Sequence, residues 1–568
     1  MENFYTDNPA LRYYLNNSLM RQIVTLRERD FSQSQSYGYA PLNFEDAMEG
    51  YERVLVEIGK VCGEIIAPNA EKVDKEGCHL EENEVHYAEA TVENMKALHQ
   101  AGVSCVSIPR KYNGLNFPLS VFMVMADMIS RADASLQNIW GLQDCADTIC
   151  DFGSEEQKEH YLKRIAQGET MAMALTEPDA GSDLQSVRLK ATFDEEHKCW
   201  RLNGVKRFIT NGNGSIVLVL ARTEDGSTDG RGLSMFIYDK QKGGVTIRRI
   251  ENKMGIKGSP TCEMVFKNAE AELCGERRFG LIKYVMSLMN NARLGIAGQA
   301  VGLCEASYRE ASSYAKERKQ FGKSIIEFPP IYEMLGLMKA KVDAVRALLY
   351  ETCRMTDMYK SFEAIAQERK LTPEERAEYK SYNKIASALT PLCKGISSEY
   401  ANQCAYDSLQ IHGGSGYMKD YTCERVYRDS RITSIYEGTT QLQVIASIPH
   451  ILNGTYANLI QKYNALNYPE EFIPLRERIN TIFQLYLTLV ERVKALGNAE
   501  AVSFLARKLY EMVGCVIMSY LLLIDASQRK DLFENSLKVF VDYAEVEVKS
   551  KALFIENFGV EKMEYYKK

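Results

Sequence analysis

Three apolar runs decide the fold class of this chain: Cys199-Trp-Arg-Leu-Asn-Gly204, Ile216-Val-Leu-Val-Leu220 and Leu233-Ser-Met-Phe-Ile-Tyr238. They are rich in β-branched and aromatic residues, which favour strands. Because turn signals separate the runs, we expect a β domain of sandwich or barrel type over residues 169–280. The turn signals are Asn203-Gly204, Asn211-Gly212, Asp225-Gly226 and Gly243-Gly244.

Helical periodicity flanks this β region on both sides. Over residues 44–168 apolar residues recur at helical spacing, as in Asp46–Gly59. The same period returns over residues 281–450, where the charged segment Met358–Tyr379 is expected to be an exposed insertion between two helices. The pattern therefore predicts an α+β chain with several domains, as a length of 568 residues also requires.

A further helical domain is expected over residues 451–568. An apolar stripe from Leu475 to Val493 is broken at Gly497-Asn498, and helical patterns follow over Val502–Ile524 and Leu532–Phe558. Such stripes usually form a domain core. Membrane-surface binding is the weaker alternative, because the exposed positions are not strongly basic.

Composition narrows the class of protein. The net charge of −7 argues against a nucleic-acid partner, and the 14 cysteines include no C-x-x-C pair. The 7 histidines do not cluster with cysteines, so no metal site is expected. Residues 1–43 form an N-terminal extension, expected to be irregular, without signal- or transit-peptide features. The apolar run Cys515–Ile524 is too short to span a membrane, and we expect a cytoplasmic protein with no integral membrane segment.

One carboxylate stands out in the segment Arg431–Gln441. Glu437 lies between Tyr436 and Gly438, just before a helix that Thr439 or Thr440 could cap. A carboxylate held by a tight turn in an apolar setting can act as a base on a carbon acid, because desolvation raises its proton affinity. The alternative is an ordinary surface acid favoured by the helix dipole.

Two segments of the β region suggest a ligand. Met173–Asp183 combines hydroxyls, a proline and small turn residues, whose free amides can bind an anionic or carbonyl-rich group. Phe208 and Thr210 occupy alternate positions at a strand end, so they face the same way and suit a flat aromatic ligand with a hydrogen-bonding edge. The alternative is a surface turn and a strand end.

A series of motifs, in this order, resembles the acyl-CoA dehydrogenases, a family of FAD enzymes. The resemblance covers residues 44–450 approximately, and several long motifs in one order are highly specific. The motifs are Arg131-Ala-Asp-Ala-Ser-Leu136, Phe152-Gly-Ser-Glu-Glu-Gln-Lys158, Thr176-Glu-Pro-Asp-Ala-Gly-Ser-Asp183, Phe208-Ile-Thr-Asn-Gly212, Lys253-Met-Gly-Ile-Lys-Gly-Ser-Pro-Thr261, Glu317-Arg-Lys-Gln-Phe-Gly-Lys323, Gln410-Ile-His-Gly-Gly-Ser-Gly-Tyr417 and Ile435-Tyr-Glu-Gly-Thr-Thr-Gln441.

The resemblance implies a helical N-terminal domain (44–168), a middle β domain (169–280) and a C-terminal four-helix bundle (281–450). Residues 451–568 resemble the extra helical domain of larger members, which are typically homodimers, so a homodimer is favoured. The flavin is implied to lie between the β domain and the bundle.

The resemblance also implies the ligand contacts. Leu175 and Thr176 resemble contacts to the isoalloxazine ring, Phe208 its aromatic wall, and Thr210 the hydroxyl at flavin N5. Arg318 resembles the cation that binds the FAD pyrophosphate from a neighbouring subunit, since a guanidinium offers a fork of donors. Further implied FAD contacts are Gln320, Phe321, Gln410, Gly413, Gly414, Thr439 and Gln441; implied acyl-CoA contacts are Ser182, Arg293, Tyr436 and Gly438.

The implied reaction is α,β-dehydrogenation of an acyl-CoA thioester to the trans-2-enoyl-CoA, in fatty-acid β-oxidation or related lipid metabolism. Glu437 is the implied base for the pro-R α-proton, hydride passes to FAD N5, and electrons go on to an electron-transfer flavoprotein. Some members supply the base from the position of Ala292, but alanine has no basic group, so this position cannot supply the base here. The alternatives are an acyl-CoA oxidase and a non-catalytic protein that binds flavin or acyl-CoA.

Three positions depart from the family pattern. Phe208 replaces a common Trp, Gln320 stands where a Thr or Ser often helps bind the pyrophosphate, and Asn290 replaces an Asp of some members near the CoA adenine. These departures put individual contacts in doubt rather than the resemblance itself.

Overall fold

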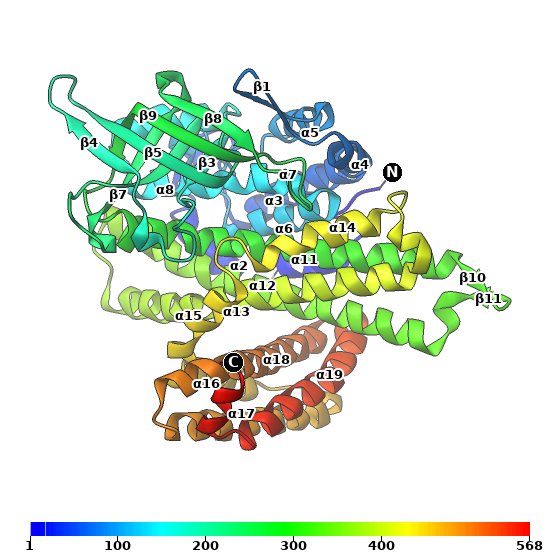
Figure 1. The fold of residues 1–568 in the computed structure, drawn as a ribbon. Helices are drawn as coiled ribbons and strands as arrows, with labels where there is room; N and C mark the ends of the chain where they lie inside the picture. Colours follow the sequence, from blue (N-terminus) through cyan, green and yellow to red (C-terminus); the bar gives the residue numbers. More distant parts are fainter. Residues whose placement is uncertain (1, 17–18, 568) are drawn as a thin grey trace. The chain divides into compact units, whose positions relative to one another are not determined.

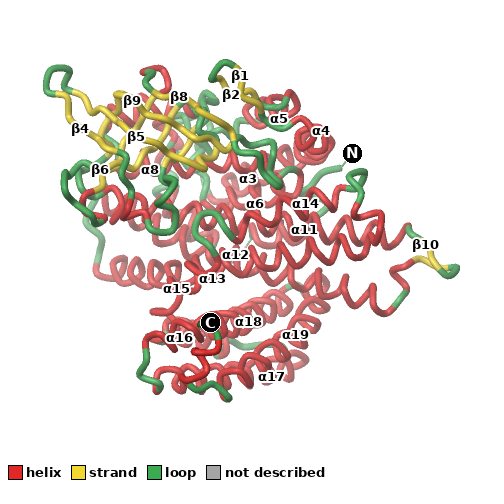
Figure 2. Tube along the Cα trace, in the orientation of Figure 1, coloured by secondary structure: helices red, strands yellow, loops and turns green. Residues whose placement is uncertain are grey.

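The computed structural model describes residues 2–16 and 19–567 and divides into two compact units. Unit 1 comprises Met1–Leu11 and Ser18–Gly295, and unit 2 comprises Arg12–Asn17 and Ile296–Lys568. The chain is mostly helical, with its main sheet in the middle of the sequence (Figure 2). The expected α+β class, with a β domain between helical parts, is confirmed.

The N-terminal extension is more regular than expected. Helices α1 (Pro9–Leu15) and α2 (Met20–Arg27) and the turn η1 (Ser32–Gln35) lie within it. The expectation of an irregular segment is wrong because Met20, Ile23 and Val24 recur at helical spacing and are buried on one face of α2.

The rest of the N-terminal part of unit 1 is built from short helices and one small hairpin. Helix α3 begins where Asn43 accepts a hydrogen bond from the Asp46 backbone N–H at 2.9 Å, and a capping box at Ser154 starts α9. The elements are α3 (Phe44–Val61), η2 (Cys62–Ile66), α4 (Ala67–Glu76), β1 (His79–Glu81), β2 (Glu84–His86), α5 (Glu89–Gln100), η3 (Arg110–Tyr112), α6 (Leu119–Ala132), α7 (Ala134–Trp140), η4 (Gly141–Gln143), α8 (Asp144–Phe152), α9 (Glu155–Gln157), η5 (Lys158–Leu162) and α10 (Lys163–Ala166).

The β domain is a seven-stranded sheet in the order β3-β6-β4-β5-β9-β7, with β8 paired to β9. Strand β7 pairs with both β9 and β6, which closes the sheet on itself. The strands, with short turns between them, are β3 (Met171–Ala174), η6 (Leu184–Ser186), β4 (Lys190–Asp194), β5 (Cys199–Thr210), β6 (Ile216–Arg222), η7 (Gly230–Gly232), β7 (Leu233–Asp239), η8 (Lys240–Lys242), β8 (Val245–Ile250) and β9 (Thr261–Cys274).

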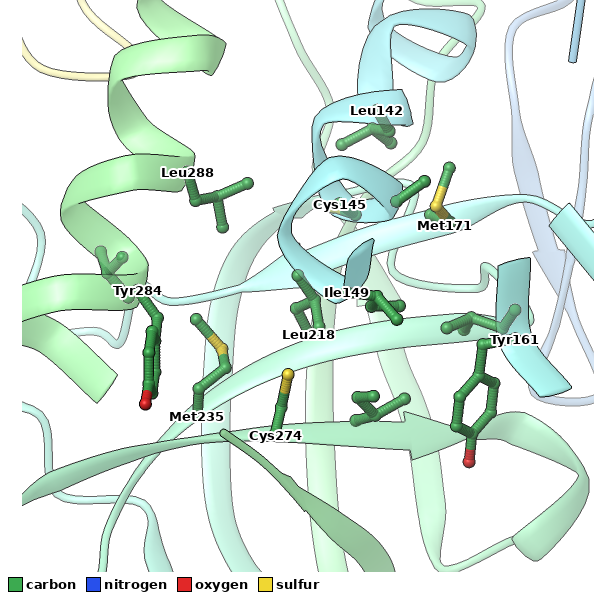
Figure 3. Close-up of a cluster of buried hydrophobic side chains, with 14 of the residues drawn as sticks. Leu142, Cys145, Ile149, Tyr161, Met171, Leu218, Met235, Cys274, Tyr284 and Leu288 are labelled. Carbon is green, nitrogen blue, oxygen red and sulfur yellow. The ribbon is translucent and has the colours of Figure 1, made fainter. Parts of the chain in front are cut away.

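Each face of this sheet carries its own core. On one face Leu218 and Met235 pack with Leu142, Cys145 and Ile149 of the preceding helices (Figure 3). On the other face the alternate residues Val217, Val219 and Phe236 form a second buried cluster. Strands β6 and β7 are buried on both faces, which explains why they are continuous apolar runs.

Unit 2 contains the long helices α12 and α13, which are joined by a short turn and pack against each other (Figure 1). A capping box between Thr372 and Glu375 starts α13. The expected insertion Met358–Tyr379 is therefore wrong: these residues are the ends of two helices, and Met358 and Phe362 are buried. The elements are η9 (Gly280–Val285), α11 (Met286–Glu317), β10 (Lys319–Gln320), β11 (Lys323–Ser324), η10 (Ile325–Glu327), α12 (Pro329–Glu368), α13 (Pro373–His412), η11 (Gly413–Tyr417), α14 (Thr422–Ser430), η12 (Arg431–Ser434) and α15 (Thr440–Leu452), of which η9 and the start of α11 lie in unit 1.

The last part of unit 2, which we call the appended domain, is helical as expected. By length and composition α18 could cross a membrane, but 89% of its most apolar window is buried within the protein. Its core side chains thus pack against neighbouring helices. The elements are α16 (Thr455–Asn464), η13 (Glu470–Phe472), α17 (Ile473–Ala495), α18 (Ala499–Gln528), α19 (Lys530–Glu556) and η14 (Val560–Tyr565).

Candidate functional site

The predicted site residues fall into two groups, one in each unit, and each group is described by itself. Unit 1 holds Leu175, Thr176, Ser182, Phe208, Thr210 and Arg293. Unit 2 holds Arg318, Gln320, Phe321, Gln410, Gly413, Gly414, Tyr436, Glu437, Gly438, Thr439 and Gln441.

In unit 1 the segment that follows β3 is fixed through its backbone. The buried Lys206 ammonium donates to the Leu175 carbonyl at 2.8 Å and to the Glu177 carboxylate at 2.9 Å. The Arg207 N–H donates to the Thr176 carbonyl at 3.0 Å. Leu175 and Thr176 are thereby locked to the end of β5, the strand that carries Phe208 and Thr210.

Phe208 stands in a bulge of β5. The register against β9 shifts between Lys206 and Ile209, and Phe208 has a left-handed φ of 61°. Ile209 is buried, whereas the Phe208 ring is 52% exposed and Thr210 is half-buried. Phe208 and Thr210 thus both lie away from the core, but the bulge interrupts the regular alternation on which their expected common direction rested, and that expectation stays a prediction. A non-glycine residue in this conformation is strained, and such residues are frequent at functional sites as well as in turns.

The expected acyl-CoA residues of unit 1 lie on different elements. Ser182 is exposed in the turn before η6, next to Asp183, whose carboxylate accepts from the Ser186 hydroxyl at 2.7 Å. Arg293 lies on α11 and donates to Asn290, one turn earlier, at 3.2 Å. Asn290 therefore orients the Arg293 guanidinium through a neutral hydrogen bond. An Asp at position 290 would orient it through an ion pair.

In unit 2 a two-residue turn presents Phe321. Phe321 and Gly322 have φ of 51° and 84° between β10 and β11, and the hairpin projects from the ends of α11 and α12 (Figure 1). The Phe321 side chain is 93% exposed, and its ring makes an edge contact with Phe328. Within the part of the chain that the structure describes, no side chain pairs with the Arg318 guanidinium. The Gln320 side chain donates to the neighbouring Lys319 carbonyl at 2.7 Å.

The end of α13 forms an open backbone surface. Gly413 has a φ of 59°, and a Cβ added there or at Gly414 would meet nothing within 4 Å. His412, just before, is stacked on Tyr314 with ring centroids 4.3 Å apart. Gln410 is exposed beside this surface, so a flat polar group can approach the backbone closely.

Glu437 lies in the short connection between η12 and α15. It has a left-handed φ of 53° and is followed by Gly438 at 88°. Thr439 caps α15, since its hydroxyl accepts from the Leu442 N–H at 3.4 Å, and Gln441 is exposed in the first turn. The Tyr436 hydroxyl donates to the buried Gln299 of α11. The carboxylate is therefore presented beside a positive helix end by a constrained backbone.

Sequence reasoning missed the buried residues whose side chains donate to the backbone carbonyls of these segments. Lys206 and Gln443 belong to quoted or adjoining stretches, and Lys394 lies in an apolar helical run. The only signal was a lysine within an otherwise buried pattern, since a buried ammonium needs acceptors. Among the described residues there is also no group of His, Cys, Asp or Glu that could hold a metal ion.

Comparisons with known proteins agree along the chain. Family models described as "Acyl-CoA dehydrogenase, N-terminal domain", "middle domain" and "C-terminal domain" match residues 50–169, 172–269 and 282–448. A fourth, "Acyl-CoA dehydrogenase C terminal", matches residues 452–563. The domain boundaries expected from the sequence stay predictions.

Three similar proteins illustrate the match. The 3-methylmercaptopropionyl-CoA dehydrogenase of Ruegeria pomeroyi is 34% identical over 71% of this chain and 70% of its own length. A crystal structure of an acyl-CoA dehydrogenase complexed with FAD, from Bacillus anthracis, is 26% identical with a TM-score of 0.72, covering 89% of this chain and 87% of that one. A chain in a study of the electron transferring flavoprotein of Acidaminococcus fermentans is 29% identical with a TM-score of 0.61, covering 71% and 97%.

Proposed function

Since this chain belongs to the acyl-CoA dehydrogenase family and is a flavoprotein oxidoreductase that uses FAD, we propose that Glu437 is the base of its reaction. The substrate is an acyl-CoA thioester, and the product is the trans-2-enoyl-CoA. The observation that carries this proposal is the left-handed conformation of Glu437 beside the N-terminus of α15. An ordinary surface acid at a helix N-terminus does not require a strained backbone, so the strain at Glu437 supports a functional role.

The residues present suit FAD. In unit 1 the bulged, exposed Phe208 offers a ring face. In unit 2 Arg318, which pairs with no side chain among the described residues, offers a cation for a pyrophosphate, and the open glycines Gly413 and Gly414 admit close approach. When bound, FAD would supply a hydride acceptor for the β-hydrogen. The protein's part is to bind, orient and polarise.

Proton removal requires an activated thioester, because an ordinary α-proton is too weakly acidic for a carboxylate. The Glu437 backbone N–H is the proposed donor to the thioester carbonyl, which stabilises the negative charge that develops on oxygen. Glu437 would thus supply both the base and one polarising donor. The two groups belong to one residue, so the conformation of that residue sets their separation.

The natural electron acceptor of this proposal is an electron-transfer flavoprotein, supported by the likeness to the chain studied with such a protein in A. fermentans. We further propose a cytoplasmic homodimer that acts in fatty-acid β-oxidation or related lipid metabolism. A neighbouring subunit would place its Arg318 on the FAD pyrophosphate, which accounts for a cation without an ion-pair partner among the described residues of its own chain.

The test follows the visible absorbance of the bound flavin under anaerobic conditions while a panel of saturated acyl-CoAs is added. Bleaching by one chain-length class is expected for the wild type and not for Glu437→Gln. Glu424→Gln is the control, since Glu424 is paired with Arg428 on α14. Flavin that no acyl-CoA bleaches would contradict the proposal, and rapid reoxidation by oxygen would indicate an oxidase.

A further inference from the structure

One face of α13 carries donors for the backbone that leads to Glu437. Asn402, Ser398 and Lys394 are spaced by four residues, so their side chains lie on one face of the helix. They donate to the carbonyls of Ser430, Thr433 and Gly438 at 3.1, 2.9 and 2.6 Å. The whole connection from α14 to α15 is therefore attached to α13 at regular intervals.

Lys394 makes the last and most polar of these contacts. Its side chain is fully buried, and an ammonium that donates to a carbonyl in such a setting forms a charge-assisted hydrogen bond. Gln443, also buried, donates to the carbonyls of Glu437 and Gly438 at 3.3 and 3.0 Å. Two side chains thus fix the two peptide groups that follow the Cα of Glu437.

These hydrogen bonds from Lys394 and Gln443, which we call the clamp, explain how the strained conformation of Glu437 persists. A non-glycine residue at positive φ is strained, and this conformation is kept only where its surroundings over-determine it. Glu437 and Gly438 are both at positive φ, and their carbonyls are the groups held by Lys394 and Gln443. Without these donors the backbone of Glu437 is free to relax toward an ordinary conformation.

The appended domain supports α13 at the same place. Pro391 lies inside α13, and a proline in a helix removes one backbone hydrogen bond and opens the helix locally. Tyr456 of α16 donates to the Ala388 carbonyl at 2.6 Å. Tyr510 of α18 donates to the carbonyls of Pro391 and Leu392 at 2.9 and 3.1 Å.

Tyr510 thereby reaches the turn of α13 that carries Lys394. Gly395 leaves the space for the phenol, because a Cβ at that position would overlap the Tyr510 hydroxyl and lie 3.1 Å from Cζ. One turn further along α13, Glu399 accepts from the Thr440 hydroxyl at 2.7 Å and lies 3.5 Å from Arg507 of α18. The appended domain is thus connected to both sides of Glu437 through α13.

We propose that Lys394 is a positioning residue for the Glu437 base, and that Tyr510 of the appended domain holds Lys394 in place. The inference rests on the function proposed above. It gives the appended domain, residues 452–563, a role in catalysis. The domain contributes no reacting atom and acts through α13.

The first test is Lys394→Met, which keeps the length of the side chain and removes its donors. The rate of flavin reduction by an active acyl-CoA is expected to fall by about 10- to 100-fold, as for a misplaced catalytic group. The kinetic isotope effect with α-deuterated substrate is expected to rise and the pH profile of the rate to shift. Affinity for a non-oxidisable acyl-CoA analogue is expected to change little. A merely structural loss would lower flavin content or stability without these kinetic changes.

Tyr510→Phe tests the link to the appended domain, with Tyr520→Phe as the matched control. Tyr520 lies on the same helix, and its buried hydroxyl has no hydrogen-bond partner among the residues that the structure describes. We expect Tyr510→Phe to change the rate, isotope effect and pH profile in the same direction as Lys394→Met by a smaller factor. Tyr520→Phe should leave all three at the wild-type values. Equal behaviour of the two phenylalanine variants would overturn the role of Tyr510.

Two further readouts separate failure of this inference from failure of the proposed function. If Lys394→Met does not fold, Gln443→Met removes the second donor of the clamp and takes its place. Hydrogen exchange of the peptide over residues 434–443 should be faster in either variant, whether or not an acyl-CoA reduces the flavin. A wild-type protein that no acyl-CoA reduces contradicts the proposed function. If the wild type is active and both variants show the exchange rates and kinetics of the wild type, the proposed role of Lys394 and Gln443 is wrong.

Discussion

The ammonium of Lys206 lies 2.9 Å from the carboxylate of Glu177, and both side chains are buried in the β domain. Glu177 also accepts from the backbone N–H groups of Arg188 and Leu189 at 2.8 and 2.9 Å. Burial lowers the pKa of Lys206 to about 8, while the charge of Glu177 opposes that shift. The pair joins β5, the segment after β3 and the start of β4, and so shapes the expected flavin contacts Leu175 and Thr176.

Removing one partner of this pair should cost more than removing both. Lys206→Met leaves the Glu177 carboxylate buried without its cation, which typically destabilises a protein by about 3–5 kcal/mol. We expect urea unfolding of the double variant Lys206→Met/Glu177→Gln to show less destabilisation than Lys206→Met alone. Additive losses in this double-mutant cycle would mean that the two side chains do not interact.

Much of this arrangement could be predicted from the sequence. The strand runs from Ile216 and Leu233, the cap at Thr439 and the breaks at Asn453-Gly454 and Gly497-Asn498 follow from local propensity, and the structure has them where they were expected. The turn expected at Asn203-Gly204 is wrong, because β5 continues through it to Thr210. The bulge at Phe208 could not be predicted, because it depends on pairing with β9. A lysine in a buried pattern is a signal for Lys206 and Lys394, but their partners could not be predicted, since both bind backbone carbonyls, whose positions no motif encodes.

Arg318 and Lys319 are neighbours with the same charge, and they should differ in their effect on FAD. Arg318→Gln is expected to weaken FAD binding by roughly 10- to 100-fold, since hydrogen bonds to charged groups contribute about 1.5–3 kcal/mol. Fluorescence of FAD released on dilution measures this. Lys319→Gln is the control, because Lys319 carries the same charge but lies in β10, whereas the Arg318 N–H closes the last turn of α11 on the Tyr314 carbonyl.

Two outcomes would decide the origin of this contact. If the neighbouring subunit supplies Arg318, FAD release from the wild type should increase as the protein is diluted below its dimer dissociation range. Equal FAD affinity in Arg318→Gln and Lys319→Gln would show that the pyrophosphate is bound elsewhere.

Asp525 of α18 should make the stability of unit 2 depend on pH. Its carboxylate accepts hydrogen bonds from Tyr14 at 2.5 Å and Tyr13 at 2.9 Å, yet burial raises the pKa of Asp525 from 3.8 to about 6. Between these values the folded protein holds a proton that the unfolded chain has released. The contribution of this group therefore falls as pH rises from about 4 to about 6, by on the order of 2 kcal/mol.

The variant Asp525→Asn isolates this effect from the other groups that titrate in the same range. The difference in unfolding free energy between Asp525→Asn and the wild type should shift in favour of Asn as pH rises from 4 to 6, and stay constant above about 7. Chemical unfolding at several pH values gives this difference. A difference independent of pH would mean that Asp525 is ionised in the folded protein at pH 4.

Substitutions at Gly395 and Tyr510 should have non-additive effects on the free energy of unfolding. Gly395→Ala places a methyl group where the Tyr510 hydroxyl lies, and overpacking of a buried contact typically costs about 1–3 kcal/mol. In the Tyr510→Phe background the hydroxyl is gone and the nearest ring carbon is 3.1 Å away. The same substitution should therefore destabilise the phenylalanine variant less than it destabilises the wild type.

Gly336→Ala provides the matched control, because this glycine lies in α12 with nothing within 4 Å of an added Cβ. Alanine in a helix interior is favoured over glycine by roughly 0.5–1 kcal/mol, so this variant should be more stable than the wild type. The two Gly→Ala changes thus have opposite expected signs in thermal unfolding. If Gly395→Ala also stabilises the protein, the close packing of α18 on α13 is absent in solution, and Tyr510 cannot support Lys394 through it.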